Sequence, residues 1–363
     1  MEPYSNQLFG LDFNTLKEML QSQYFNEIQS INYEDSDHKV GMPGICGEYA
    51  IPKLEITTNN GTEAIVLFGR RQLSNTESKQ AHHYRYLSEI GIPVPKLYGA
   101  ITDSNNCEIL FLEYAQEITD EKDFFSEEKN ITEFIDLAAQ FLSMHLSHNY
   151  IGLIGKDMGN KSDTRDWKTW MSWSVFIIEK IWDLASQNKL GIDLKKMCED
   201  CNTKNKLQRI AFNMIKKIGS FDIGIAHSDF RPNNMVHLNN HKLGLIDFED
   251  VIIDSKYYDI ARYLGAPDQV FKWEVTKRDY YIDFFIDRCK KYEGKKLNHQ
   301  KMRDELFHIW YTRSINMWEW LPHEYGGPEY DFWPTGKNSE ERCQNLSVLL
   351  NALIHNSDRI IIN

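Results

Sequence analysis

The sequence of 363 residues contains no run of roughly eighteen apolar residues and no apolar core behind a basic amino terminus. We therefore expect no membrane-spanning helix and no secretion signal. Cysteine is sparse: of six residues, only Cys198 and Cys201 have metal-ligand spacing, and no second pair completes a zinc site. We expect free thiols in a reducing compartment, which favours a cytoplasmic protein.

Basic charge is scarce as well. Lys and Arg total 41 against 53 Asp and Glu, so that the net charge is −12. Binding to a phosphate backbone needs clustered Lys and Arg, which argues against nucleic acid as a partner and mildly favours a small cationic molecule. The sequence also lacks internal repeats and low-complexity linkers. Its apolar content of 42% is sufficient for two packed cores.

One loop and one strand end near the middle of the chain concentrate polar side chains. The loop is His227–Met235, with Asp229 and Asn234 five residues apart, and the strand is Lys242–Ile246, which leads into Asp247. Transfer of a γ-phosphoryl group needs a carboxylate beside the acceptor hydroxyl and oxygen ligands that hold Mg²⁺ across the phosphates. Carboxylate and amide oxygens are ligands that Mg²⁺ accepts. The two segments therefore predict a magnesium-dependent phosphoryl-transfer centre.

A hairpin would bring the two parts of this centre together. Met235–Leu238 and Leu243–Ile246 have the pattern of two strands joined by a turn, which places Asn234 and Asp247 at the same end. The alternative is that Asn234, soon after Pro232, belongs only to a turn. The second strand nevertheless leads into four residues of which three are acidic, and packing gives no reason for such a concentration.

The loop resembles the catalytic loop of the aminoglycoside phosphotransferase and choline kinase superfamily. The usual form of that loop is His-Gly-Asp, two variable residues, Pro, one variable residue and Asn. His227, Asp229, Pro232 and Asn234 match it, whereas Ser228 replaces the usual Gly. Further matches to the family follow along the chain, at Ile246–Glu249, Asp254 and Tyr258–Ala261.

The resemblance implies a role for several of these residues. Asp229 would be the catalytic base, and Asn234 and Asp247 would be the magnesium ligands. Asp259 would brace the catalytic loop rather than touch the substrate.

Arg231 lies inside the same loop. By the resemblance it would help to neutralise phosphate, and an ion pair with Glu249 or Asp250 is the alternative.

The resemblance also implies the fold. We expect an α+β, two-lobe protein-kinase-like fold, with an antiparallel sheet plus helix in a nucleotide-binding lobe at residues 1–113. A large, mainly helical lobe at residues 114–363 would carry the catalytic hairpin, residues 225–250, and the acceptor site. Asn59–Gly61 is a hairpin signal inside the expected sheet.

The expected nucleotide site departs from the family at one position. Gly44 and Gly47 would let backbone amides approach phosphate oxygens. In the family a Lys or Arg on the third strand grips the α- and β-phosphates, but Phe68 stands there, and the nearest basic residues are Arg70 and Arg71. Either a bulge brings Arg70 into the site or the ion pair is altered; otherwise both arginines are solvated surface charges.

The helix expected at Thr76–Ile90 departs from the family pattern as well. Gln80 stands where the family has the acidic partner of the gripping cation, with Glu77 one turn earlier. Beyond the following strand, by resemblance to the lobe hinge of kinase-like folds, backbone groups of Glu113 and Ala115 would hydrogen-bond the purine of ATP or GTP.

Helical apolar spacing dominates the carboxyl-terminal half. We expect five helices there, at Asp166–Gln187, Asp193–Ile218, Phe271–Tyr292, His299–Trp320 and Ser339–Ile354. Tryptophans of this region, with nearby acids, suit an ammonium group or an aminosugar, and ordinary core packing is the alternative. Leu321–Lys337, with three Pro and three Gly, is expected to form a lid at the acceptor site, or else a structural cover.

These observations predict a kinase that transfers the γ-phosphoryl group of ATP or GTP to a hydroxyl of a small cationic acceptor. An aminoglycoside antibiotic, as in antibiotic resistance, is the first expectation, and choline-like amino alcohols or sugars are the rivals. A monomer or a homodimer is expected. The alternative of another class is a kinase-like binding protein without turnover, which Phe68 and Gln80 motivate.

Overall fold

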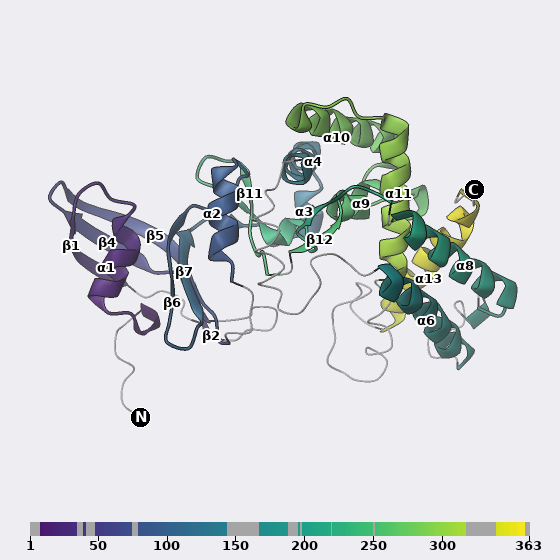
Figure 1. Cartoon of the computed structure of the whole chain (residues 1–363), viewed down its shortest axis with the longest axis horizontal. Coiled ribbons are helices and arrows are strands. Elements are labelled where there is room, and N and C mark those ends of the chain that lie inside the picture. The colour runs from purple at the N-terminus through teal and green to yellow at the C-terminus, as the bar shows by residue number, and fades with distance from the viewer. Residues whose placement is uncertain are drawn as a thin grey trace. The chain divides into compact units, whose positions relative to one another are not determined.

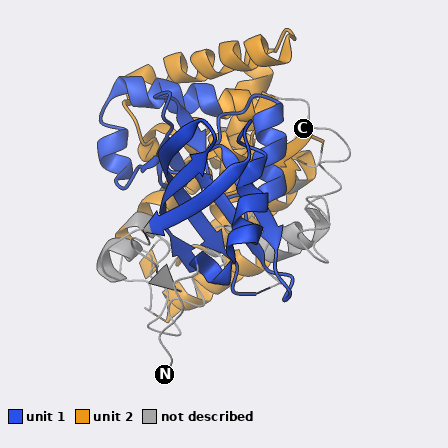
Figure 2. Ribbon diagram, turned by 90° about the vertical axis from the view of Figure 1, so that its left-hand side faces the viewer, with its two compact units in different colours: residues 1–137, 157–159, 231–250 blue, residues 138–156, 160–230, 251–363 orange. Residues whose placement is uncertain are grey.

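The computed structural model describes residues 8–34, 39–40, 48–74, 79–143, 167–187, 195–196, 198–218, 220–249, 251–316 and 339–359. The chain forms two compact units, which interleave along the sequence (Figure 2). The first unit comprises residues 1–137, 157–159 and 231–250, and the second comprises residues 138–156, 160–230 and 251–363.

The first unit is built on a seven-stranded antiparallel sheet (Figure 1). Its strands are β1 (Ile28–Glu34), β2 (Lys39–Val40), β3 (Glu48–Ala50), β4 (Lys53–Thr58), β5 (Gly61–Arg71), β6 (Leu97–Thr102) and β7 (Glu108–Glu113). The order is β1-β4-β5-β3-β2, and β7 pairs with β5 and β6. The helical elements of the amino-terminal part are η1 (Leu8–Gly10), α1 (Phe13–Gln21) and α2 (Ala81–Glu89).

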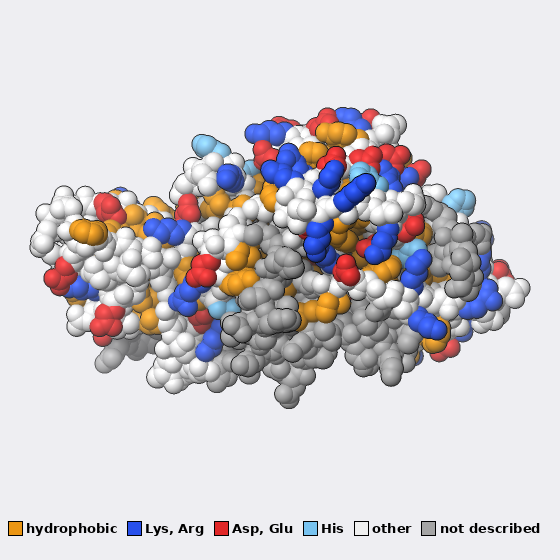
Figure 3. All heavy atoms as spheres, turned by 45° about the horizontal axis from the view of Figure 1, so that its top comes forward, with side chains coloured by type: hydrophobic (Ala, Val, Ile, Leu, Met, Phe, Trp, Pro, Cys, Tyr) orange, Lys and Arg blue, Asp and Glu red, His pale blue; other side chains and the backbone are white. Residues whose placement is uncertain are grey.

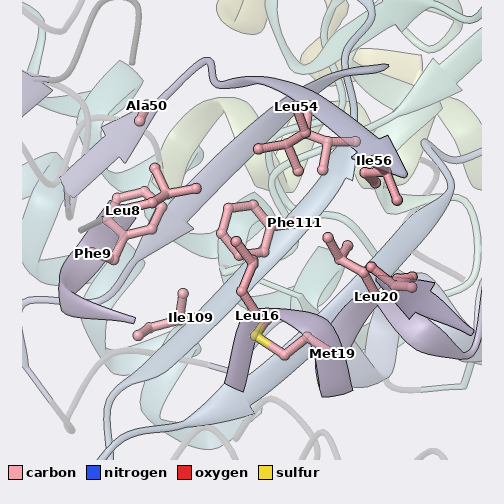
Figure 4. Close-up of a cluster of buried hydrophobic side chains, with 12 residues drawn as sticks. Leu8, Phe9, Leu16, Met19, Leu20, Ala50, Leu54, Ile56, Ile109 and Phe111 are labelled. Carbon is pink, nitrogen blue, oxygen red and sulfur yellow. The ribbon is translucent and has the colours of Figure 1, made fainter. Parts of the chain in front are cut away.

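Local sequence explains the β4–β5 hairpin and the core beneath it. Thr58 pairs with Gly61 across a two-residue turn, and Gly61 has a φ of +124°, so that the expected hairpin is confirmed. Alternate residues of β4, such as Leu54 and Ile56, point inward, as the two-residue period of a strand requires. They pack with side chains of η1, α1 and β7, including Phe111, in the cluster of Figure 4.

A second, small sheet in the first unit carries the predicted hairpin. Strands β10 (Met235–His237) and β11 (Leu243–Leu245) pair antiparallel, and β8 (Gln116–Glu117) extends them on the other side of β10. The short helix η2 (Pro232–Asn234) precedes β10, and α3 (Glu121–Phe124) lies nearby.

The described part of the second unit is mainly helical. After α4 (Glu128–Ser143), which starts in the first unit, its helices are α6 (Trp167–Ser186), α8 (Cys201–Ile218), α9 (Tyr258–Leu264), α10 (Arg278–Glu293), α11 (His299–Asn316) and α13 (Ser339–His355). Short 3-10 turns are η3 (Asp268–Val270), η4 (Val275–Lys277) and η6 (Asn356–Arg359), and β9 (Ile223–Ala226) pairs with β12 (Ile252–Ser255). Helix α11 packs against α6, α8, α9 and α10.

Two helices of the second unit begin several residues later than the sequence predicted. Helix α8 begins at Cys201 instead of Asp193, because the Asp200 carboxylate accepts the N–H groups of Asn202 and Thr203 at 2.9 and 3.2 Å and so caps it. Helix α10 begins at Arg278 instead of Phe271, since the 3-10 turn η4 occupies the three residues that precede it.

Acidic and basic side chains are intermixed on the face shown in Figure 3. Among the ion pairs of the second unit, the Arg303 guanidinium of α11 lies 2.6 Å from the Asp279 carboxylate and 2.7 Å from that of Asp283. Within the described part of the chain, no helix combines the length and apolar character needed to cross a membrane.

Candidate active site

The hairpin brings Asn234 and Asp247 to one end of its two strands, as predicted. Met235 pairs with Leu245, and the N–H of Ile246 donates to the carbonyl of Asn234 at 3.1 Å. Asn234 is 7% exposed, and its own N–H donates to the carbonyl of Arg231 at 2.9 Å.

Asp247 has an unusual backbone conformation. Its φ is +65°, in the left-handed region that Asp tolerates better than most residues. Its N–H donates to the hydroxyl of Tyr84 at 3.4 Å. Burial raises the pKa of Tyr84, and the negative charge of Asp247 adds to the rise, so that the phenol stays protonated.

A cavity of about 340 Å³ lies wholly within the first unit and includes this hairpin end. Its polar lining consists of Arg70, Gln80, Glu113, Glu117, Asn233, Asn234, Asp247 and Glu249. Its remaining lining is Tyr49, Ile51, Phe68, Tyr84, Pro95, Leu110, Leu112, Tyr114, Ala115, Val236 and Ile246. The cavity therefore brings together five candidates that lie far apart in the sequence, namely Arg70, Glu113, Ala115, Asn234 and Asp247. Gly44 and Gly47 lie outside the described residues.

Strand β5 carries Arg70 to the cavity without a bulge. Its pairing with β7 runs in register from Leu67 to Arg71, so that Phe68 and Arg70, two residues apart, share one face. Both line the cavity. Gly69 points the other way, where a Cβ atom would come within 2.8 Å of the Phe111 ring. Arg70 thus lies two residues beyond Phe68, on the strand face where a cation was expected from the sequence.

The ion pair of Arg70 is altered, as one of the sequence alternatives proposed. The Arg70 guanidinium lies 3.0 Å from the carboxylate of Glu249, and the two side chains are 13% and 30% exposed. Burial acts against its charged form, but Glu249 and Asp247 outweigh this effect and raise the pKa of Arg70. Arg70 is therefore a partly buried cation beside two acids rather than a solvated surface charge.

Arg71 points away from this group of charges. It lies 3.1 Å from the carboxylate of Asp103 and 3.6 Å from that of Glu48.

Helix α2 begins one residue after Gln80. The carboxylate of Glu108 accepts the N–H groups of Gln80 and Ala81, at 2.7 and 3.2 Å. Burial raises the pKa of Glu108, while these two donors act in the opposite sense. The side-chain oxygen of Gln80 accepts the N–H of Phe248 at 3.4 Å, so that α2 is tied to the segment after β11. Glu77 lies outside the described residues.

Glu113 and Ala115 lie where β7 leaves the sheet, at the cavity wall. The backbone of Glu113 is fixed by its N–H, which donates to the carbonyl of Lys96 at 2.8 Å. Its carboxylate accepts the N–H of Lys96 at 3.2 Å and also accepts from the Asn239 side chain.

The loop before Asp229 belongs to the second unit, and an acid braces it there. The two carboxylate oxygens of Asp259 accept the N–H groups of His227 and Ser228, at 2.7 and 3.0 Å. Burial raises the pKa of Asp259, and Arg313 acts in the opposite sense. The contact expected of Asp259 is therefore present.

Arg313 on α11 is a further anchor of this loop, which the sequence did not reveal. It donates to the carbonyls of Ser228 and Tyr258, each at 3.0 Å, and lies 4.2 Å from the centre of the Tyr258 ring. Ser228 has a φ of +68°, which explains why the family usually has Gly at this position. On the two residues before Asp229, Asp259 thus binds both N–H groups, and Arg313 binds the carbonyl group of Ser228.

The chain passes from the second unit to the first between Phe230 and Arg231, so that Asp229 and the two candidate metal ligands belong to different units. Among the described residues, no group of three or more His, Cys, Asp or Glu side chains could hold a metal ion.

Two tryptophans of the expected acceptor region belong to the core. Trp182 on α6 is 6% exposed and Trp310 on α11 is 5% exposed, and the latter ring lies 6.2 Å from that of Phe307. The alternative of ordinary helix packing therefore holds for both. Leu321–Lys337 and the remaining tryptophan side chains of that expectation lie outside the described residues.

Comparisons with known proteins show what the chain is similar to. The model of the phosphotransferase enzyme family matches residues 52–288, more than half of the chain. The comparison with curated proteins found no match.

Two solved structures are similar over most of the chain. Ethanolamine kinase of Plasmodium vivax has a TM-score of 0.50 and 14% sequence identity, and the match covers 89% of this chain and 84% of that one. A protein of Ralstonia eutropha JMP134 that has been proposed to be an aminoglycoside phosphotransferase has a TM-score of 0.53 and 11% identity, with coverage of 96% and 99%. These likenesses show the fold, and the prediction of an α+β, protein-kinase-like fold is confirmed.

Proposed function

Because the chain belongs to the phosphotransferase enzyme family, we propose that it transfers the γ-phosphoryl group of a nucleoside triphosphate to a hydroxyl of a small acceptor. One observation carries this proposal. The cavity of the first unit combines a partly buried cation, Arg70, with two oxygen-bearing side chains at one hairpin end, Asn234 and Asp247. Triphosphate binding needs both kinds of group in one place.

The nucleotide would occupy this cavity as its magnesium complex. The side-chain oxygens of Asn234 and Asp247 would hold Mg²⁺, with phosphate oxygens and water as the remaining ligands. Bound Mg²⁺ would neutralise charge on the phosphates. Arg70 would contact the phosphates while it stays paired with Glu249.

The purine would lie at the wall where Glu113 and Ala115 follow β7. Their backbone groups would hydrogen-bond its edge, and apolar side chains such as Leu112 and Val236 would cover its faces.

Asp229 would act on the acceptor. Its carboxylate would take the proton of the acceptor hydroxyl as the oxygen attacks the γ-phosphorus and the bond to the β-phosphate oxygen breaks. Asp259 and Arg313 would keep the loop in place, since they hold the two residues before Asp229. Arg231 would help to neutralise the phosphoryl group.

We propose a small cationic alcohol as the acceptor, either an aminoglycoside antibiotic or an amino alcohol. The net charge of −12 favours such a partner. The alternative, a binding protein without turnover, rests on the missing cation at Phe68 and on Gln80, and Arg70 in the same cavity weakens the first of these two reasons.

A turnover panel tests the proposal. ATP or GTP consumption is measured with aminoglycosides, choline, ethanolamine and sugars, each with Mg²⁺ and with a chelator. We expect at least one acceptor to stimulate consumption only with Mg²⁺, and Asp247→Asn to reduce the rate about 100-fold or more. Asp287→Asn, the same change at an exposed site on α10, should leave the rate unchanged. Nucleotide binding without acceptor-stimulated turnover would favour the binding-protein alternative.

A further inference from the structure

Gln80 contributes a buried polar group to the cavity of the first unit. It is 2% exposed and lines the cavity together with Arg70, Asp247 and Glu249. Its side-chain nitrogen Nε2 is buried, and it has no hydrogen-bond partner among the residues that the structure describes. Buried amide groups nearly always have a partner, because an unpaired one loses its bonds to water without compensation.

The orientation of this amide follows from its neighbours. The backbone N–H of Phe248 can only donate, so that Oε1 of Gln80 accepts from it at 3.4 Å and Nε2 turns elsewhere. The backbone of Gln80 is fixed as well, since its N–H donates to the Glu108 carboxylate at 2.7 Å. Gln80 therefore offers two side-chain N–H donors from a fixed position at the cavity wall.

The charges around Gln80 indicate which kind of ligand would accept a hydrogen bond from its side-chain nitrogen. Arg70 lines the same cavity as a partly buried cation, and Asp247 is one of the two proposed magnesium ligands. A ligand that satisfies a cation, a metal ion and an amide donor together is an oxyanion with several oxygens, which the triphosphate supplies. We infer that Gln80 donates a hydrogen bond to a non-bridging phosphate oxygen of the bound nucleotide. This inference rests on the proposed function.

The place of the ion pair explains why an amide suits position 80. Glu249 already pairs with Arg70 at 3.0 Å. A carboxylate at position 80 would be a third acid beside Asp247 and Glu249, and it would repel the phosphates instead of binding them. In this chain the acidic partner of Arg70 is Glu249, which lies in the segment after β11 and not on α2. Position 80 carries a hydrogen-bond donor instead of an acid.

Two variants of Gln80 test this role against a purely structural one. Gln80→Leu removes the donors, and Gln80→Glu removes them but keeps an oxygen for the N–H of Phe248. The matched control is Gln72→Leu, because Gln72 is also a buried glutamine of the first unit and its Oε1 accepts the N–H of Glu108 at 2.8 Å, away from this cavity.

The dissociation constants of the magnesium complexes of non-hydrolysable ATP and GTP analogues, and of adenosine and guanosine, are measured by calorimetry on the full chain. For the purine that the wild type prefers, Gln80→Leu should weaken triphosphate binding about tenfold and change nucleoside binding less than about twofold. Gln80→Glu should weaken triphosphate binding further. Gln72→Leu should change neither constant, although it lowers the melting temperature.

Three outcomes would overturn the inference. In the first, Gln80→Glu binds the triphosphate as tightly as the wild type or more tightly, as a family-type acidic partner of Arg70 would. In the second, the Gln80→Leu variant loses the nucleoside and the triphosphate to the same extent, or neither. In the third, the wild type itself binds no triphosphate, and the proposed function then fails together with the inference.

Discussion

Ser228 and Asp247 are the two residues of the candidate site with left-handed backbone conformations, with φ angles of +68° and +65°. Such conformations cost energy in residues other than Gly, and they persist where neighbours hold them. Asp259 and Arg313 hold Ser228, whereas Tyr84 contacts the N–H of Asp247. Specific hydrogen bonds therefore accompany these two residues in backbone conformations that local preference disfavours.

Replacement of Ser228 by Gly should stabilise the protein. Glycine adopts this φ without strain, while its greater freedom in the unfolded chain offsets part of the gain. The expected net gain in the free energy of unfolding is about 0.5 kcal/mol. Chemical denaturation measures it. Ser347→Gly, in the middle of α13, is the control and should lose about 0.5–1 kcal/mol. A loss in Ser228→Gly as large as that of the control would contradict the account.

Replacement of Arg313 by Lys should slow turnover with little effect on nucleotide affinity. A lysine cannot bond both carbonyls with a planar fork, so that the loop before Asp229 would shift. We expect kcat to fall on the order of 10- to 100-fold, because small displacements of catalytic groups have effects of this size. The KM for the nucleotide should stay the same, since the cavity lies in the other unit.

The matched control is Arg303→Lys on the same helix. Arg303 pairs with Asp279 and Asp283 at the surface, and its replacement should change neither constant. An equal rise in KM and fall in kcat for Arg313→Lys would indicate general destabilisation and not a role in positioning.

Among the elements, the sequence predicted those whose signals are local. The turn at Asn59–Gly61 predicted the β4–β5 hairpin, and two apolar runs around a polar turn predicted the β10–β11 hairpin. The convergence of Asn234 and Asp247 follows from the second hairpin alone, so that it was accessible without a structure.

Contacts between elements distant in sequence were not accessible in this way. Arg70 and Glu249 are 179 residues apart, and Arg313 and Ser228 are 85 residues apart. Neither pair has a spacing that a helix or a strand imposes, because only tertiary packing brings the residues together. The resemblance to the family did not reveal them either, since it places an acid at position 80 and gives no role to α11.

The packing of α9 against α11 depends on a glycine. A Cβ atom at Gly265 would collide with the backbone carbonyl of Leu306 and come within 2.7 Å of the Cβ of Trp310. Gly265→Ala should therefore lower the free energy of unfolding by about 2–3 kcal/mol, as measured by denaturation.

Gly294 at the end of α10 provides the contrast. Its φ is +65°, but open space surrounds the position of a Cβ atom. Gly294→Asn should cost less than about 1 kcal/mol, because Asn tolerates this conformation. Equal losses in the two variants would refute the steric explanation for Gly265.

At the scale of the whole molecule, stability should depend on pH through His308. Burial lowers the pKa of this histidine, which is 5% exposed and bonded to the carbonyl of Asp304. Below about pH 6.5 the unfolded chain therefore takes up a proton that the folded chain refuses. The contribution of neutral His308 to the free energy of unfolding is therefore complete above about pH 6.5. It is lost as the pH falls towards the pKa of His308 in the folded chain.

The comparison of wild type with His308→Gln isolates this contribution. Between about pH 6.5 and the pKa of His308 in the folded chain, the free energy of unfolding should fall by at most about 1.4 kcal/mol for each pH unit. This part of the pH dependence should be absent from the variant. Burial raises the pKa values of Glu108, Asp259 and Glu305, which favours the folded state on acidification, and these groups are common to both proteins. Parallel curves of unfolding free energy between pH 8 and 5 would contradict the assignment to His308.

We propose that the chain moves a phosphoryl group from a nucleoside triphosphate to an alcohol, with Asp229 as the base. Phosphorus NMR of a reaction with Mg²⁺, triphosphate and the acceptor panel tests it most directly, because it distinguishes a phosphate monoester from inorganic phosphate. We expect the wild type to form a new monoester signal with at least one acceptor, and Asp229→Asn to form it at least about 100-fold more slowly. Inorganic phosphate as the sole product, or equal monoester formation by both proteins, would contradict it.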